Sequence, residues 1–145
     1  MNQKPSVSFS HIGICTSDIE RSVAFYTQAL GFELLHAIDD LGPPFDTLME
    51  LPGTKLAVRQ LRCGDVTIEL IGYAVGEVVG SIDRKAMNRL GFTHMTLKVD
   101  DVDAIAALIT QHGGKVHPET RIDSHFGPIL FCTDPDGVRI EVMQP

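Results

Sequence analysis

The chain has no tryptophan, only three cysteines and no long hydrophobic run in its 145 residues. Cys15, Cys63 and Cys132 are odd in number and widely spaced. Such spacing argues against a disulfide framework or a zinc ribbon and favours a reducing compartment. No apolar stretch approaches the length of a membrane span, and the first residues lack the apolar core of a signal peptide. We therefore expect a cytoplasmic protein without a membrane segment.

Positive charge is also scarce. Lysine and arginine number 12 against 19 aspartates and glutamates, so the formal net charge is −7, and the basic residues form no cluster. This balance argues against a nucleic-acid or anionic-membrane surface. The nucleophile elbow, the phosphate-binding loop and the dinucleotide fingerprint are missing too. We expect a small molecule as the partner.

An internal repeat is the main feature that the sequence does have. His11 is followed by Glu69 in the first half, and His94 is followed by Glu141 in the second, all on strand-like runs. The surroundings match as well, with Val66-Thr67-Ile68-Glu69 against Val138-Arg139-Ile140-Glu141. A tandem duplication is the economical explanation.

Each half reads as a strand, a helix and three further strands, which predicts an α+β fold of two tandem βαβββ modules. The expected bounds are 7–75 for the first module, 76–90 for a connector and 91–145 for the second module, all within one structural domain. A half of this size would be marginally stable alone, so the halves should share a core or dimerise.

Local signals place the helices and the loops. Ser17-Asp18-Ile19-Glu20 resembles a capping box, which predicts a helix that runs to about Leu30. Asp100 or Asp101 should start the second helix. The first half is the longer one, and residues 39–53, rich in glycine and proline, are expected to hold its extra residues as a loop. The connector is expected to hold one or two helical turns from residue 81.

The alternation of side chains along the strands points to a metal site. His11, Glu69, His94 and Glu141 each lie on the strand face opposite the aliphatic residues on which helices would pack. Two imidazoles and two carboxylates on one surface are a ligand set for a divalent metal. A lone histidine on a strand is more often structural, but the repeat and the shared face together favour a common site.

Several other residues leave alternatives open. His125 can border a pocket or lie in a solvated turn. Cys15 shares a strand face with His11 and can be an exposed thiol near the site, but a small buried residue is the better interpretation. Arg59 and Arg62 lie on opposite faces of the predicted third strand. Either can meet an anionic substrate, or both can be solvated.

The quoted motifs carry a resemblance to a known family. The opening SHIGICTSDIERSVAFYTQALGF, the middle GFTHMTLKVDDVDAIAALITQHGG and the closing FCTDPDGVRIEVMQP are similar to the vicinal oxygen chelate superfamily. This superfamily includes glyoxalase I, methylmalonyl-CoA epimerase, extradiol dioxygenases and antibiotic-resistance proteins. The resemblance spans about residues 7–143. It implies a cupped mixed sheet with the helices on its outer face and the metal on its concave face.

The resemblance also implies ligands, cofactor and activity. The four ligand positions carry over onto His11, Glu69, His94 and Glu141, which implies one divalent metal per site: nickel, cobalt, manganese or zinc rather than iron. The implied reaction is a lyase or isomerase reaction with proton transfer next to a carbonyl, with Glu141 or Glu69 as the base. A homodimer is expected, because superfamily members commonly dimerise.

Two alternatives to the lyase or isomerase stay open. One is a metal-free resistance protein that binds an antibiotic or a metabolite, and the other is an iron-dependent extradiol-type dioxygenase. The substrate also stays open, because Cys15 and Tyr73 stand where short bacterial glyoxalase I has an arginine and an asparagine.

Overall fold

The computed structural model describes residues 4–145. The first half contains β1 (Ile12–Cys15), α1 (Ile19–Ala24), the π-helical turn η1 (Phe25–Ala29), β2 (Glu33–Leu41), the short helix α2 (Phe45–Leu48), β3 (Lys55–Cys63) and β4 (Val66–Val75). The second half contains β5 (Met95–Lys98), α3 (Val102–Gln111), β6 (Lys115–Ser124), β7 (Gly127–Thr133) and β8 (Arg139–Met143).

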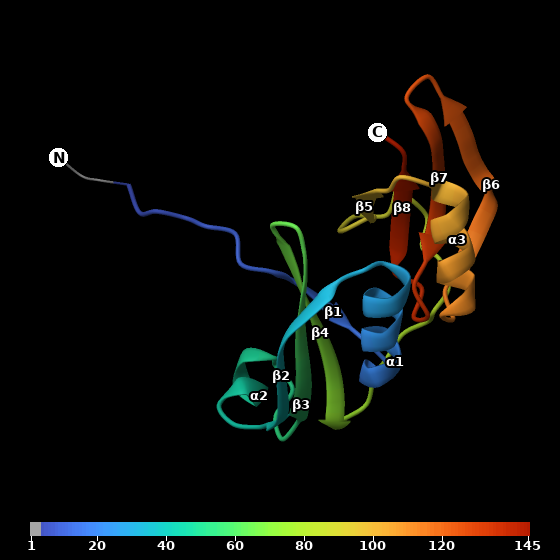
Figure 1. Ribbon diagram of the computed structural model, residues 1–145. Coiled ribbons are helices and arrows are strands. Elements are labelled where there is room, and N and C mark those ends of the chain that lie inside the picture. Colours follow the sequence, from blue (N-terminus) through green and yellow to red (C-terminus); the bar gives the residue numbers. More distant parts are fainter. Residues whose placement is uncertain (1–3) are drawn as a thin grey trace.

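The strands form two four-stranded sheets with the same topology (Figure 1). The first has the order β1-β4-β3-β2 and the second β5-β8-β7-β6. β1 pairs in parallel with β4, and β5 pairs in parallel with β8. The other neighbours in each sheet are antiparallel. The α+β class and the tandem modules predicted from the sequence are thus confirmed.

Aspartates, rather than a serine, cap the helices. Asp18 accepts a hydrogen bond from the backbone N–H of Arg21 at 3.0 Å, and Asp101 accepts one from the N–H of Ala104 at the same distance. The expected serine cap at Ser17 is wrong, because its hydroxyl bonds to the other module. After η1 the chain leaves the helix through Gly31, whose φ of 71° favours glycine.

The two modules share one hydrophobic core where their helices meet. Fully buried side chains of both halves pack in a single cluster that includes Phe25, Tyr26, Ile109 and Val142. α3 contacts η1, and α1 and α3 lie side by side in Figure 1. Ile68 and Leu70 of β4 enter this core, so Glu69 between them points to the opposite face.

Two segments differ from their expected structure. The predicted loop 39–53 contains the end of β2 and the helix α2, because the chain continues its pairing with β3 as far as Leu41. The connector between β4 and β5, all of which the structure describes, holds turns and bends but no helix. The one or two helical turns expected from residue 81 are therefore wrong. Among residues 4–145, no helix is long and apolar enough to cross a membrane.

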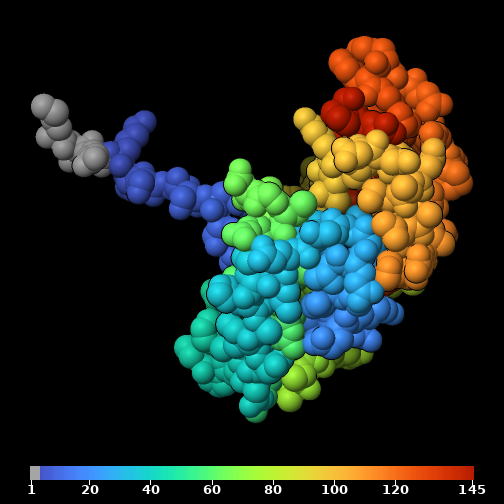
Figure 2. Space-filling model, in the orientation of Figure 1, coloured from blue at the N-terminus to red at the C-terminus, as the bar shows by residue number. Residues whose placement is uncertain are grey.

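The segment before β1 projects away from the body of the protein. Residues 4–11 are all exposed, and Figure 2 shows this segment as an arm. Val7 and Phe9 on it are 96% and 73% exposed. Large apolar side chains that are exposed in this way have no packing partner among the described residues of the same chain.

Candidate metal centre

The first predicted pair of ligands is brought together in the first sheet. His11 lies directly before β1, and its Nε2 is 3.6 Å from Oε1 of Glu69 on the parallel neighbour β4. The Ser10 hydroxyl lies 2.9 Å from Nδ1 of His11, so the other ring nitrogen faces the carboxylate. Gln60, opposite Glu69 on β3, donates its amide hydrogen to Oε2 at 2.8 Å. Ser10 therefore orients the His11 ring, and Gln60 orients the Glu69 carboxylate.

The second pair repeats this geometry in the second sheet. Nε2 of His94 lies 3.8 Å from Oε2 of Glu141, and the Thr93 hydroxyl lies 2.9 Å from Nδ1 of His94. The Thr96 hydroxyl donates to Oε1 of Glu141 at 3.3 Å. Phe131 takes the place opposite the glutamate that Gln60 takes in the first sheet, and its ring packs edge-on against His94 with centroids 5.2 Å apart.

The geometry of both pairs fits metal ligation. Donor atoms held about 2.1 Å from one ion are separated by about 3.0–3.6 Å, close to the two nitrogen–oxygen distances. In both histidines the neighbouring hydroxyl engages Nδ1, which leaves Nε2 as the nitrogen that would bind an ion. The donor set of imidazoles and carboxylates suits a divalent transition metal.

The two pairs do not combine within one chain. Among residues 4–145, no group of three or more histidines, cysteines, aspartates or glutamates is close enough to hold an ion. β1 and β5 are edge strands of separate sheets, and no backbone ladder in this range joins them. Each chain thus presents two separate His–Glu pairs, each of which we call a half-site of the predicted metal centre.

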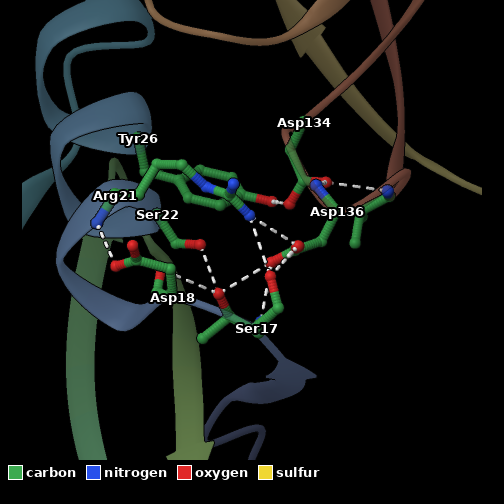
Figure 3. A network of polar contacts seen from close by, with 9 residues as sticks. Ser17, Asp18, Arg21, Ser22, Tyr26, Asp134 and Asp136 are labelled. Atoms are coloured by element: carbon green, nitrogen blue, oxygen red, sulfur yellow. Dashed lines mark hydrogen bonds and ion pairs between the residues drawn. The ribbon is translucent and has the colours of Figure 1, made fainter. Parts of the chain in front are cut away.

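A polar network joins the two modules (Figure 3). In the turn before β8, Asp136 accepts hydrogen bonds from the Thr16 hydroxyl at 2.8 Å and from the Ser17 backbone N–H at 2.9 Å. It also pairs with Arg21 of α1 at 2.8 Å. Tyr26 donates its hydroxyl hydrogen to Asp134 at 3.0 Å.

The two aspartates of this turn have opposite pKa shifts. Burial raises the pKa of Asp134, although hydrogen bonds from Val138, Tyr26 and Asp136 oppose it. Burial also acts to raise the pKa of Asp136, but hydrogen bonds from Ser17 and Thr16 and the charge of Arg21 outweigh it and lower that pKa. Asp136 is therefore held as a carboxylate in the joint between the modules.

Most of the other singled-out residues have structural partners. Arg59 pairs with Glu20 and Asp39, each at 2.9 Å, and Arg62 pairs with Glu33 at 2.8 Å. Their ion pairs explain both arginines without a substrate.

His125 packs on the ring of Phe126 in the turn between β6 and β7. Cys15 is exposed, and burial together with the charge of Asp136 raises the pKa of its thiol. Cys15 also lines the cavity beside His94, so the prediction of a buried residue is wrong.

That cavity lies between β1, the connector and the start of β5. Its volume is about 690 Å³, and its walls include Cys15, Arg89, His94 and Arg139. Sequence reasoning missed Arg139, because the repeat aligns it with Thr67, a neutral residue. The available signal was that Arg139 lies two residues before Glu141 on one strand, which places both side chains on the same sheet face.

Comparisons with known proteins agree with the fold. The chain is 29% identical to a 2-epi-5-epi-valiolone epimerase of Actinomyces sp. over 95% of this chain and 79% of that protein. It is 28% identical to the lactoylglutathione lyase of Salmonella typhimurium strain LT2, covering 92% of this chain and 90% of the lyase. A crystal structure of a glyoxalase family protein from Bacillus cereus superposes with a TM-score of 0.84 at 16% identity, covering 98% and 96% of the two chains.

The sequence model of one family matches residues 8–142, nearly the whole chain. Both His–Glu pairs lie inside that match. The chain belongs to the Glyoxalase/Bleomycin resistance protein/Dioxygenase superfamily.

Proposed function

We propose that the protein is a divalent-metal-dependent lyase or isomerase that moves a proton next to a carbonyl of a small-molecule substrate. The observation that carries this proposal is the repeated pair: His11 with Glu69 and His94 with Glu141, at 3.6 Å and 3.8 Å. The similarity to an epimerase and to a lactoylglutathione lyase supports the same class of reaction.

We propose further that two chains form a homodimer in which each complete site takes one half-site from each chain. Exposed apolar side chains precede both ligand histidines at equivalent positions of the repeat: Val7 and Phe9, and Leu90 and Phe92. Leu90 is fully exposed at 100% and Phe92 is 92% exposed. The edges β1 and β5 beside them remain open to a second copy, which would cover apolar surface and complete the ligand set.

In such a site the glutamates would have different tasks. Gln60 holds Glu69 through a 2.8 Å hydrogen bond, whereas the hydrogen bond that Glu141 accepts from Thr96, within residues 4–145, is longer, at 3.3 Å. We therefore assign proton abstraction from the carbon next to the carbonyl to Glu141, the more loosely held carboxylate. Glu69 stays a ligand, and the two histidines present Nε2. The ion, when bound, would act as a Lewis acid toward the substrate oxygens.

Metal analysis with a matched variant tests the proposal. Untagged protein supplemented with nickel, cobalt, manganese or zinc should bind about one ion per chain, since a dimer would carry two sites. His94→Ala should lose metal and turnover together, whereas His125→Ala, in a turn, should keep both. Stoichiometric metal and unchanged turnover in His94→Ala would rule the site out.

The activity screen separates the remaining classes. Hemithioacetals, 2-methyl-branched acyl-CoAs and cyclic hydroxy ketones test the lyase and isomerase reactions. Tight fosfomycin or metabolite binding that survives chelator treatment would instead support a metal-free resistance protein. Iron with oxygen uptake on catechols would support a dioxygenase.

A further inference from the structure

Arg139, the first residue of β8, is a buried arginine on the same sheet face as Glu141. Only 9% of it is exposed, and the two residues share a face because they are two apart on one strand. The ring of Phe131 lies between Arg139 and the half-site, 5.3 Å from Cζ of Arg139 and 5.2 Å from the ring of His94. The guanidinium thus lies one aromatic ring away from a candidate metal ligand.

The charge of Arg139 has no counter-ion in the described chain. Nη2 donates to the backbone carbonyl of Lys85 at 2.6 Å, but the buried Nε has no hydrogen-bond partner among residues 4–145. None of the arginine ion pairs in this range includes Arg139. Burial lowers its pKa, and nearby Arg84 lowers it further, yet a guanidinium stays charged at neutral pH.

A buried, unpaired guanidinium is unfavourable unless something of opposite charge binds it. Other residues packed around it do not supply that charge. Glu119 of β6, which lies 3.7 Å from Nδ1 of His117, pairs with Arg84 at 2.8 Å. The neighbouring His117 is buried, and its ring lies 3.3 Å from the Thr133 hydroxyl. The positive charge of Arg139 is therefore left for a ligand.

The cavity beside Arg139 has room and the matching charge for such a ligand. Arg139, His94, Lys85 and Arg89 all line its volume of about 690 Å³. Of its acidic residues, Asp136 is already paired with Arg21, which leaves Asp83, hydrogen-bonded to Ser81, against the three basic side chains of Lys85, Arg89 and Arg139. Basic side chains thus gather here in a chain whose formal net charge is −7.

We propose that Arg139 binds an anionic group of the substrate, a carboxylate or a phosphate, that lies a few bonds from the reacting carbon. This inference rests on the proposed function, because it takes the reacting oxygens to lie at the His94–Glu141 half-site. Arg139 donates to the anion from the side that lines the cavity, while Nη2 keeps its bond to the Lys85 carbonyl. Both oxyanions match the donors of a guanidinium.

Paired chelators that differ only in their tails test the proposal. Acetohydroxamate and the monohydroxamates of succinate and glutarate offer a metal the same two oxygens, but only the latter two carry a carboxylate. Their affinities are measured by calorimetry on nickel-loaded protein. A phosphonate-tailed hydroxamate of the same length distinguishes the two kinds of anion.

In the wild type the better carboxylate-tailed or phosphonate-tailed compound should bind about 10-fold to 100-fold more tightly than acetohydroxamate, the range for a hydrogen bond to a charged group. Arg139→Gln should lose this preference and keep the affinity for acetohydroxamate. Arg62→Gln, which removes the same charge from the surface, should keep both. Arg139→Lys keeps the charge but lacks the planar guanidinium with its two parallel donors, so it should keep part of the preference. This variant replaces Arg139→Gln in the test if Arg139→Gln does not fold.

The contrary outcomes are distinct. An equal preference in the wild type and in Arg139→Gln, or no preference in the wild type, would mean that Arg139 only holds the connector. If acetohydroxamate itself does not bind, the proposed metal function fails. In that case binding of inorganic phosphate to metal-free wild type, lost in Arg139→Gln, still supports the anion site, and its absence overturns it.

Discussion

Asp136 of the second module holds Arg21 of the first at 2.8 Å, in the most polar part of the joint between the two halves (Figure 3). Only 9% of the Asp136 side chain is exposed, whereas Arg21 is 45% exposed. Hydrogen bonds from Thr16 and Ser17 complete the coordination of the carboxylate. One ionised group thus links the two modules beside their shared hydrophobic core.

Asp136→Asn should lower the free energy of unfolding by about 1–3 kcal/mol at pH 7, because buried donors lose a charged acceptor. The pKa of Asp136 is lowered in the folded state. Its contribution is therefore present above the unfolded pKa of about 3.9 and is lost as the pH falls through the folded pKa.

The difference in stability between wild type and Asp136→Asn should accordingly shrink below about pH 4. Urea unfolding at several pH values measures it. Asp134 is present in both proteins; its raised pKa acts in the opposite direction, and the charge of Asp136 is one cause of that raised pKa. Asp65→Asn, in the exposed turn between β3 and β4, is the control. A difference that stays constant with pH would contradict the role of the carboxylate.

Gln60→Leu should weaken metal binding about 10-fold to 100-fold, the usual effect of removing a residue that orients a ligand. Its amide holds Oε2 of Glu69 at 2.8 Å, so the carboxylate would lose its fixed direction. Competition with a chromophoric chelator measures the affinity. Gln111→Leu at the exposed end of α3 should leave it unchanged. Equal affinities in all three proteins would show that Gln60 does not support the site.

Gly137→Ala should detach the connector from the second module. An added Cβ would clash with the carbonyl oxygen of Ile82, and the φ of 87° already disfavours alanine. We expect a loss of stability of about 1–3 kcal/mol.

Trypsin should also cut faster after Arg84 and Lys85 in Gly137→Ala, because the connector would be released. Gly80→Ala is the matched control, since Gly80 has a φ of 120° but nothing within 4 Å of the added Cβ. Similar cleavage of both variants would mean that backbone strain, and not the contact with Ile82, explains the effect.

His11→Ala and His94→Ala should complement each other if the sites are shared between chains. After the two variants are unfolded together and refolded, about half of the dimers contain one chain of each, and each of these has one intact site. Metal content and turnover should therefore recover to about a quarter of the wild-type values. No recovery in a mixture that still dimerises would place each site within one chain.

Secondary structure and the repeat could be predicted well from the sequence, because they depend on local patterns. Alternating aliphatic residues around Glu69 and Glu141 identified the strands and their faces, and the structure places both glutamates beside their histidines. The prediction failed where a distant partner competes for a local group. Ser17 looks like a helix cap, but Asp136, far along the chain, takes its hydroxyl.

The sequence by itself determined the α+β modules and the two His–Glu pairs, since residue spacing sets which side chains share a strand face. Only the tertiary structure decided how the modules meet. They join through their helices and the Asp136 network, which leaves β1 and β5 as separate edges and keeps the half-sites apart in one chain. It alone buried Arg139 without a counter-ion among residues 4–145, because burial depends on the connector that folds over the sheet.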